Sequence, residues 1–304
     1  MQAIAFYLFY PLLWIISRLP ARLTYLLSDF AFLIVYYVIG YRKKVIINNL
    51  KIAFPEKSEI ELKELCRKTT QHFCDSFIEV IMSMSMSHDE MLSRFEYTNL
   101  ELIHQFRDQK RPIIVMFGHQ ASYEWTMCID GLVDYKIIAV YKPLANKYFN
   151  KLIVDIRQKF NSTMITMREA SSNISQSISN GDMAMYGLIA DQSPAKYRAQ
   201  HFTTFFGKTS AVFMGSEKLA KAHDTAVVYL AVEKIKRGHY KANFQTITEN
   251  AAQTKDWEIT DTFLDLLEKQ IRKQPEYYLW SHKRWKATPE NIKRKPVLSP
   301  RVQQ

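Results

Sequence analysis

Short apolar runs that alternate with helical patterns are the feature that most limits how this chain can fold. Three of these runs, at residues 112–117, 136–141 and 183–191, read PIIVMF, KIIAVY and MAMYGLIAD. A continuous apolar run of this length is typical of a strand that is buried on both faces of a sheet. The alternation therefore predicts an α/β fold with a mostly parallel or mixed central sheet that is flanked by helices.

Several segments around these runs have apolar residues spaced three and four apart, as in a helix with one buried face. The clearest is 54–82, where Ser58 and Glu61 fit a capping box just after Pro55. Further helices are predicted over 150–160, 170–182, 209–224 and 258–274. The late runs TAVVYLAVEK and HYKANFQTI are predicted to be consecutive strands that give the sheet an antiparallel edge.

The amino-terminal segment 1–41 is apolar and contains only three charged residues, Arg18, Arg22 and Asp29. A helix over residues 3–16 is about 21 Å long, which is shorter than a bilayer core of about 30 Å. Abundant tyrosine and the basic cluster at 42–44 favour membrane-anchor helices with a cytoplasmic basic end. One spanning helix, two interfacial helices and a pair of buried core helices all fit. Asp29 favours the shallower membrane arrangement.

The charge of the whole chain narrows the choice of partners. The formal net charge is +11 over 304 residues, which favours nucleic acid, anionic lipid or an acidic protein. Three scattered cysteines indicate a reducing, cytoplasmic environment. The last residues are basic and rich in proline, and we expect them to be poorly ordered. The expected organisation is a membrane anchor over 1–41, a main domain over 42–286 and a basic tail over 287–304.

The loop GHQASYE directly follows the apolar run at 112–117. Open α/β sheets bind ligands beyond the carboxyl ends of their strands, which is where His119 stands. If a helix begins near Ala121 or Ser122, the Glu124 carboxylate can reach one imidazole nitrogen and leave the other free as a base. A polar strand end fits the spacing equally well. The chain contains no nucleophile elbow, phosphate-binding glycine loop or zinc-binding helix motif.

Six stretches that occur in order along nearly the whole chain carry a family resemblance. They are RKKVIINNLKIAFPE (42–56), GHQASYEW (118–125), VYKPLANKYFNKLIVDIR (140–157), GLIADQSP (187–194), FTTFFGKTSAVFMGSEKLA (202–220) and QPEYYLWSHKRWK (274–286). Together they resemble the late acyltransferases of lipid A biosynthesis, within the broader lysophospholipid acyltransferases. The family usually ends its catalytic block in a Gly-Asn-Trp-Glu type of sequence. Here the block ends in ASYE, so residues 121–123 mark a place where the acceptor can differ.

The resemblance implies a glycerolipid acyltransferase-like fold and transfer of a fatty acyl chain to a hydroxyl of a lipid A precursor. The implied donor is acyl carrier protein, with CoA as the alternative, and no metal or other cofactor is expected. The implied catalytic pair is His119 as general base and Glu124 as its partner. The implied substrate contacts come from four further polar residues: Arg157, Asp191, Lys283 and Arg284.

Each of these four residues also has a plainer interpretation. Arg157 is assigned to a phosphate or to the oxyanion, and an ion pair is the alternative. Asp191 is assigned to ordering the site from its strand end, and a turn or cap is the alternative. Lys283 and Arg284 are assigned to lipid phosphate, and a solvated basic face is the alternative.

The resemblance places the enzyme at a bacterial inner membrane with its site on the cytoplasmic side. The expected partners are acyl carrier protein, a membrane lipid acceptor and an anionic membrane surface, with no nucleic acid. Two rival functions remain. One is the same chemistry on a lysophospholipid or an amino-acid-containing lipid. The other is a catalytically inert, membrane-associated homologue.

Overall fold

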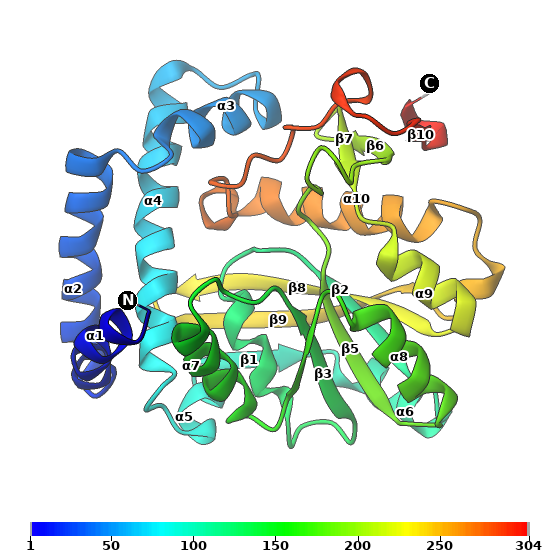
Figure 1. Cartoon of the computed structure of the whole chain (residues 1–304), viewed down its shortest axis with the longest axis horizontal. Helices are drawn as coiled ribbons and strands as arrows, with labels where there is room; N and C mark the ends of the chain where they lie inside the picture. The colour runs from blue at the N-terminus through cyan, green and yellow to red at the C-terminus, as the bar shows by residue number, and fades with distance from the viewer. Residues whose placement is uncertain (1, 303–304) are drawn as a thin grey trace.

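The computed structural model describes residues 2–302, and at its centre lies a seven-stranded sheet in the order β1-β9-β8-β2-β5-β3-β4 (Figure 1). The strands are β1 (Phe95–Thr98), β2 (Ile113–Phe117), β3 (Lys136–Tyr141), β4 (Thr163–Thr166), β5 (Ala184–Ile189), β8 (Ala226–Lys236) and β9 (His239–Thr248). Neighbouring strands are parallel except in the β8–β9 hairpin. The predicted α/β class, with a late antiparallel pair, is therefore confirmed.

Helices cover both faces of this sheet. They are α1 (Gln2–Ser17), α2 (Ala21–Leu33), α3 (Lys43–Ala53), α4 (Glu59–Met82), α5 (His88–Leu92), α6 (Leu100–Asp108), α7 (Lys147–Gln158), α8 (Ala170–Ser179), α9 (Gly215–His223) and α10 (Glu258–Lys273). All five residues of β2 are buried, as the apolar run predicts. Because side chains alternate along a strand, Ile114 and Met116 pack into the core under α8, α9 and α10, and Ile113, Val115 and Phe117 pack into the core of α5, α6 and the end of α4.

The long helix α4 begins at the residue that the sequence predicts. The Ser58 hydroxyl accepts a hydrogen bond from the Glu61 amide at 3.3 Å, and the Glu61 carboxylate accepts one from the Ser58 amide at 2.8 Å. This capping box satisfies two amide groups that would otherwise lack partners. The predicted amino terminus of the helix is confirmed, and α4 runs along one side of the domain (Figure 1).

Two expectations about the carboxyl-terminal half are wrong. The predicted helix over 209–224 begins only at α9, and its first residues belong to β7 (Lys208–Val212), which pairs antiparallel with β6 (His201–Phe205). The last three residues of β7, Ser210, Ala211 and Val212, are all buried, and pairing with β6 outweighs the helical spacing. Within the described residues the tail is not poorly ordered either, because β10 (Val297–Leu298) adds to β6 and Ser299 is fully buried.

Helix α2 lies beside α4 and is docked on it by polar residues (Figure 1). Asp29 accepts hydrogen bonds from Arg237 at 2.6 Å and from Gln71 of α4 at 2.8 Å. Tyr25 and Ser28 on the same face are buried. With the π-helical turn Ile34–Ile39, α2 forms one segment, residues 21–39, that is long and apolar enough to cross a membrane. Its inner face is thus a docking surface, and its outer face is apolar.

Candidate active site

His119 lies just past the carboxyl end of β2, in the middle of the sheet. β2 pairs with β5 on one side, so the residues that follow these two parallel strands meet at one edge of the sheet. Asp191 follows β5, and its carboxylate lies 2.6 Å from His119 Nδ1 and 3.2 Å from the His119 amide nitrogen. Gly118 suits the position between strand and histidine, because a Cβ there would lie 2.6 Å from Leu267 Cδ1 and the leucine side chain would have to shift. The fold therefore builds a His–Asp pair.

Asp191 is 1% exposed and accepts two hydrogen bonds, both from His119, and the nearby Tyr278 hydroxyl also helps to lower its pKa. Burial alone would raise its pKa, but the His119 imidazole and these hydrogen bonds hold the pKa of Asp191 below its ordinary value. The carboxylate is thus charged, and it fixes the tautomer with the proton on Nδ1. Nε2 of His119 remains to act as a base, and the Gln192 amide nitrogen lies 3.2 Å from it.

Glu124 pairs with Arg157 and not with His119. Its Oε1 accepts from Arg157 Nη2 at 2.8 Å and its Oε2 accepts from Arg157 Nε at 3.0 Å, which makes a two-pronged ion pair. The expectation that Glu124 reaches the imidazole is wrong. The physical reason is local: Ala121 has a left-handed φ of 50°, and Tyr123 packs edge-on against His119 with ring centroids 4.7 Å apart. The chain then enters the 3-10 helix Tyr123–Ile129, which directs Glu124 towards α7.

The two basic site residues predicted near the carboxyl terminus, Lys283 and Arg284, differ in their exposure to solvent. Arg284 is 1% exposed, and its Nη1 donates to Ser210 Oγ at 2.5 Å and to the Ala211 carbonyl at 2.6 Å. Arg284 is buried against β7, so the predicted contact of Arg284 with lipid phosphate is wrong. Lys283 is exposed, and its contact with phosphate stays a prediction.

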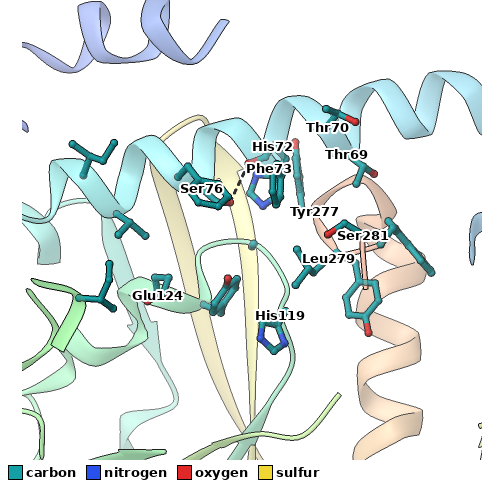
Figure 2. A pocket seen from close by; sticks show the side chains of 18 of the residues that line it. Thr69, Thr70, His72, Phe73, Ser76, His119, Glu124, Tyr277, Leu279 and Ser281 are labelled. Carbon is teal, nitrogen blue, oxygen red and sulfur yellow. Dashed lines mark hydrogen bonds between the residues drawn. The ribbon is translucent and has the colours of Figure 1, made fainter. Parts of the chain in front are cut away.

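His119, Glu124 and Arg157 line one wall of an apolar pocket of about 440 Å³ (Figure 2). The pocket lies between α4, α7, α1 and the segment 277–281, and Figure 2 shows α4 crossing above His119 and Glu124. Most of its lining is aliphatic or aromatic: Leu13, Phe73, Phe77, Val80, Ile81, Leu144, Phe149, Leu152, Ile153 and Ile156. A long, narrow alkyl chain is the kind of ligand that such walls bury well.

The pocket reaches the surface close to the amino-terminal helices. Phe77 and Leu144 line the pocket and are 60% and 50% exposed. The outer faces of α1, α2 and the π-helical turn carry many exposed apolar side chains, which we call the apolar patch: Ile4, Leu8, Phe9, Leu12, Leu23, Leu26, Phe30, Leu33, Val38 and Ile39. A surface of this kind marks contact with lipid or with another protein.

The sequence predicts His119, Glu124, Arg157 and Asp191 as site residues, but it pairs His119 with Glu124, whereas Glu124 forms the ion pair that was the alternative for Arg157. Gln192, Tyr278 and the pocket face of α4 were not predicted. Gln192 and Tyr278 lie inside GLIADQSP and QPEYYLWSHKRWK, two of the stretches that carry the family resemblance, which is the signal that could have drawn attention to them. Which side chains meet across the sheet edge depends on strand order, and spacing along the chain does not carry that information.

Comparison with known proteins shows the family of the chain. The chain is similar to the lipid A biosynthesis lauroyltransferase of Escherichia coli (strain K12), with 24% identity over 92% of this chain and 90% of the relative. It is also similar to the lipid A biosynthesis palmitoleoyltransferase of Escherichia coli (strain K12), with 23% identity over 82% of this chain and 80% of the relative. The model of the bacterial lipid A biosynthesis acyltransferase family matches residues 1–287. The chain therefore belongs to the bacterial lipid A biosynthesis acyltransferase family and is an acyltransferase.

Proposed function

We propose that this acyltransferase moves a fatty acyl group from the thioester of acyl carrier protein to a hydroxyl group of a lipid A precursor. The observation that carries the proposal is the His119–Asp191 pair at the wall of an apolar pocket. The pair supplies a base, and the pocket supplies a place for an acyl chain next to that base. The family and the named relatives support lipid A as the acceptor.

The proposed reaction begins with the acceptor hydroxyl beside His119 Nε2. The imidazole takes the hydroxyl proton as the oxygen attacks the thioester carbonyl carbon, and Asp191 stabilises the resulting imidazolium. A tetrahedral intermediate forms, and its carbonyl oxygen carries the negative charge. The carbon–sulfur bond then breaks, and the imidazolium returns its proton to the departing thiolate. The products are an ester and a free thiol, and no oxidant or reductant is needed.

In this proposal Arg157 stabilises the charge on the carbonyl oxygen. Glu124 occupies the Nε and Nη2 edge of the guanidinium, so Nη1 is the group that can donate to the substrate. Both side chains are about 20% exposed and line the pocket, so little water competes with such a contact. Glu124 thus acts through Arg157, a different role from its predicted partnership with His119.

We further propose that the enzyme works at a membrane surface, with the apolar patch in contact with lipid. The pocket reaches the surface beside α1 and the end of the π-helical turn, so a lipid acceptor could move between bilayer and site with its chains shielded from water. The net charge of +11 suits an anionic membrane and an acidic carrier protein. The cytoplasmic face of a bacterial inner membrane meets both conditions, and exposed Lys283 is proposed to contact a lipid phosphate there.

The acceptor is tested by mass spectrometry of the total lipids of the source bacterium with and without the gene. We expect lipid A to lose one secondary acyl chain in the strain without the gene, and to regain it when the wild-type gene is restored. Restoration with the His119→Ala gene is expected to leave the chain missing. Intact lipid A, with loss of an acyl chain from a lysophospholipid product or an amino-acid-containing lipid, would overturn the proposed acceptor while keeping the chemistry.

A further inference from the structure

Glu79 of α4 is a buried titratable residue that the proposed reaction does not use. Its side chain is 1% exposed, which is unfavourable for a carboxylate unless hydrogen bonds satisfy it. It accepts from the Tyr25 hydroxyl at 2.9 Å and from the Tyr240 hydroxyl at 2.6 Å, and the Ser122 hydroxyl lies 3.5 Å from it. Lys234 of β8 and Asp75 of α4 are the other charged groups that influence it.

These three hydroxyls come from different parts of the molecule. Tyr25 belongs to α2, Tyr240 belongs to β9, and Ser122 belongs to the loop between His119 and Glu124. A second contact from α4 reaches the end of the same loop, because Trp125 Nε1 donates to Ser83 Oγ at 2.9 Å and lies 3.4 Å from the Glu79 carbonyl oxygen. The turn of α4 from Glu79 to Ser83 therefore contacts α2 on one side and the loop that follows His119 on the other.

The loop needs such support because its backbone is strained. Ala121 holds a left-handed φ of 50°, a backbone conformation that is unfavourable for a residue with a Cβ. The conformation persists only if the surroundings favour it. On one side of the loop, the Ala121 amide donates a hydrogen bond to the Tyr277 carbonyl at 2.9 Å, and the Leu279 amide donates one to the His119 carbonyl at 3.1 Å. On the other side of the loop, Ser122 and Trp125 contact Glu79 and Ser83 of α4.

The position of α2 on α4 is itself set by polar contacts. One turn before Glu79, Asp75 accepts from Ser28 of α2 at 2.7 Å. Arg237 bridges Asp75 and Asp29, with 2.6 Å to each carboxylate. The opposite face of α2 belongs to the apolar patch. Displacement of α2 would therefore remove the Tyr25 hydrogen bond from Glu79.

We infer that Glu79 is a positioning residue that couples the docking of α2 on α4 to the loop carrying His119 and Glu124. With Tyr25 in place, the buried carboxylate is held where it meets Ser122, and the strained loop keeps one conformation. Without the Tyr25 hydroxyl, the Glu79 carboxylate loses one hydrogen-bond donor, and it is no longer held beside Ser122. The inference rests on the proposed acyl transfer for its kinetic readout only, because loop order can be measured without substrate.

The test uses full-length protein on vesicles of phosphatidylethanolamine and phosphatidylglycerol. Hydrogen exchange is followed by mass spectrometry over residues 118–126 in the wild type, Tyr25→Phe and Glu79→Gln. Tyr135→Phe is the matched control, because this buried tyrosine also donates one hydrogen bond, to the Arg111 carbonyl at 2.8 Å, but at the other end of β2. We expect loop exchange to rise about fivefold in the first two variants, which is the effect of losing one hydrogen bond, and to stay unchanged in the control.

Acyl transfer by the same proteins gives the second readout. We expect kcat to fall about five- to tenfold in Tyr25→Phe, with KM for the acyl donor within about threefold of the wild type, because the pocket walls are kept. A double-mutant cycle of Tyr25→Phe and Ser122→Ala should show losses in kcat that are less than additive, although no hydrogen bond joins these residues in the described chain. Additive losses would contradict the coupling.

The outcomes separate the inference from the proposed function. An active wild type, with loop exchange and kcat unchanged in a folded Tyr25→Phe variant, would overturn the inference alone. An inactive wild type whose Tyr25→Phe variant still shows faster loop exchange would overturn the proposed reaction alone. If Glu79→Gln does not fold, loop exchange and kcat of Tyr25→Phe are sufficient to test the inference.

Discussion

Asp191→Asn is the substitution that isolates what the carboxylate beside His119 does. In the proposed transition state the imidazole is becoming positive, and the Asp191 oxygen lies 2.6 Å from Nδ1. Opposite unit charges at the 2.6 Å of this pair attract by about 6 kcal/mol at an effective dielectric constant of about 20. Asparagine is neutral, and it has only one side-chain oxygen, so it cannot keep both hydrogen bonds from His119, which go to different oxygens of Asp191.

Water and local adjustment will recover part of that energy, so we expect kcat to fall about 10²- to 10⁴-fold while KM for the acyl donor changes little. The assay is the initial rate of acyl transfer by purified protein on vesicles, with thermal unfolding as the check on folding. Asp182→Asn is the matched control, because Asp182 lies just before the other end of β5 and bonds to Ser177 instead. A folded Asp191→Asn protein within threefold of wild-type kcat would refute the assigned role.

Three further predictions follow from burial and surface character. Burial raises the pKa of Glu79 from 4.5 to about 7, so the folded chain binds this proton more tightly than the unfolded chain. Its contribution to the free energy of unfolding is therefore fully present below about pH 4.5 and falls by about 3 kcal/mol up to about pH 7. Denaturant unfolding at about pH 5 and pH 8 should show a smaller decline for Glu79→Gln than for wild type, and an equal decline contradicts this. Replacing both Leu26 and Phe30 by aspartate should weaken vesicle binding at least tenfold. The control Val297→Asp, on the other side of the molecule, should bind vesicles as the wild type does. Equal binding by the wild type, the double variant and the control would exclude the apolar patch as the lipid contact. Val80→Trp should shorten the pocket and lower kcat/KM for long acyl donors about tenfold more than for short ones, and an unchanged preference would mean that the acyl chain lies elsewhere.

Most of the fold could be predicted from the sequence because its strongest signals are local. The run at 112–117 is apolar on both faces, and the corresponding strand β2 is buried on both faces. The capping box at Ser58 and Glu61 fixes the start of α4 through contacts three residues apart. Strands β6 and β7 were harder to predict, because short strands gain their stability from pairing with each other, which the spacing of residues along the chain does not report.

The site was predicted in its parts but not in its pairings. His119 and Glu124 are five residues apart, and a contact between them was one of the two interpretations that fitted that spacing. The structure instead pairs each with a residue far along the chain: His119 with Asp191 and Glu124 with Arg157. These pairings follow from the order β8-β2-β5-β3 and from the left-handed turn at Ala121, and both are properties of the assembled fold. The burial of Arg284 against β7 has the same origin.

The central claim is that His119 removes a proton from a lipid hydroxyl that then attacks an acyl thioester. Its most direct test is the initial rate of product formation, by mass spectrometry, with wild type and His119→Ala on vesicles that contain a lipid A precursor and acyl-acyl carrier protein. The account predicts one added acyl chain with the wild type and at least a 10³-fold lower rate with a His119→Ala protein that folds and binds vesicles normally. Transfer by the variant at a rate near that of the wild type would contradict it.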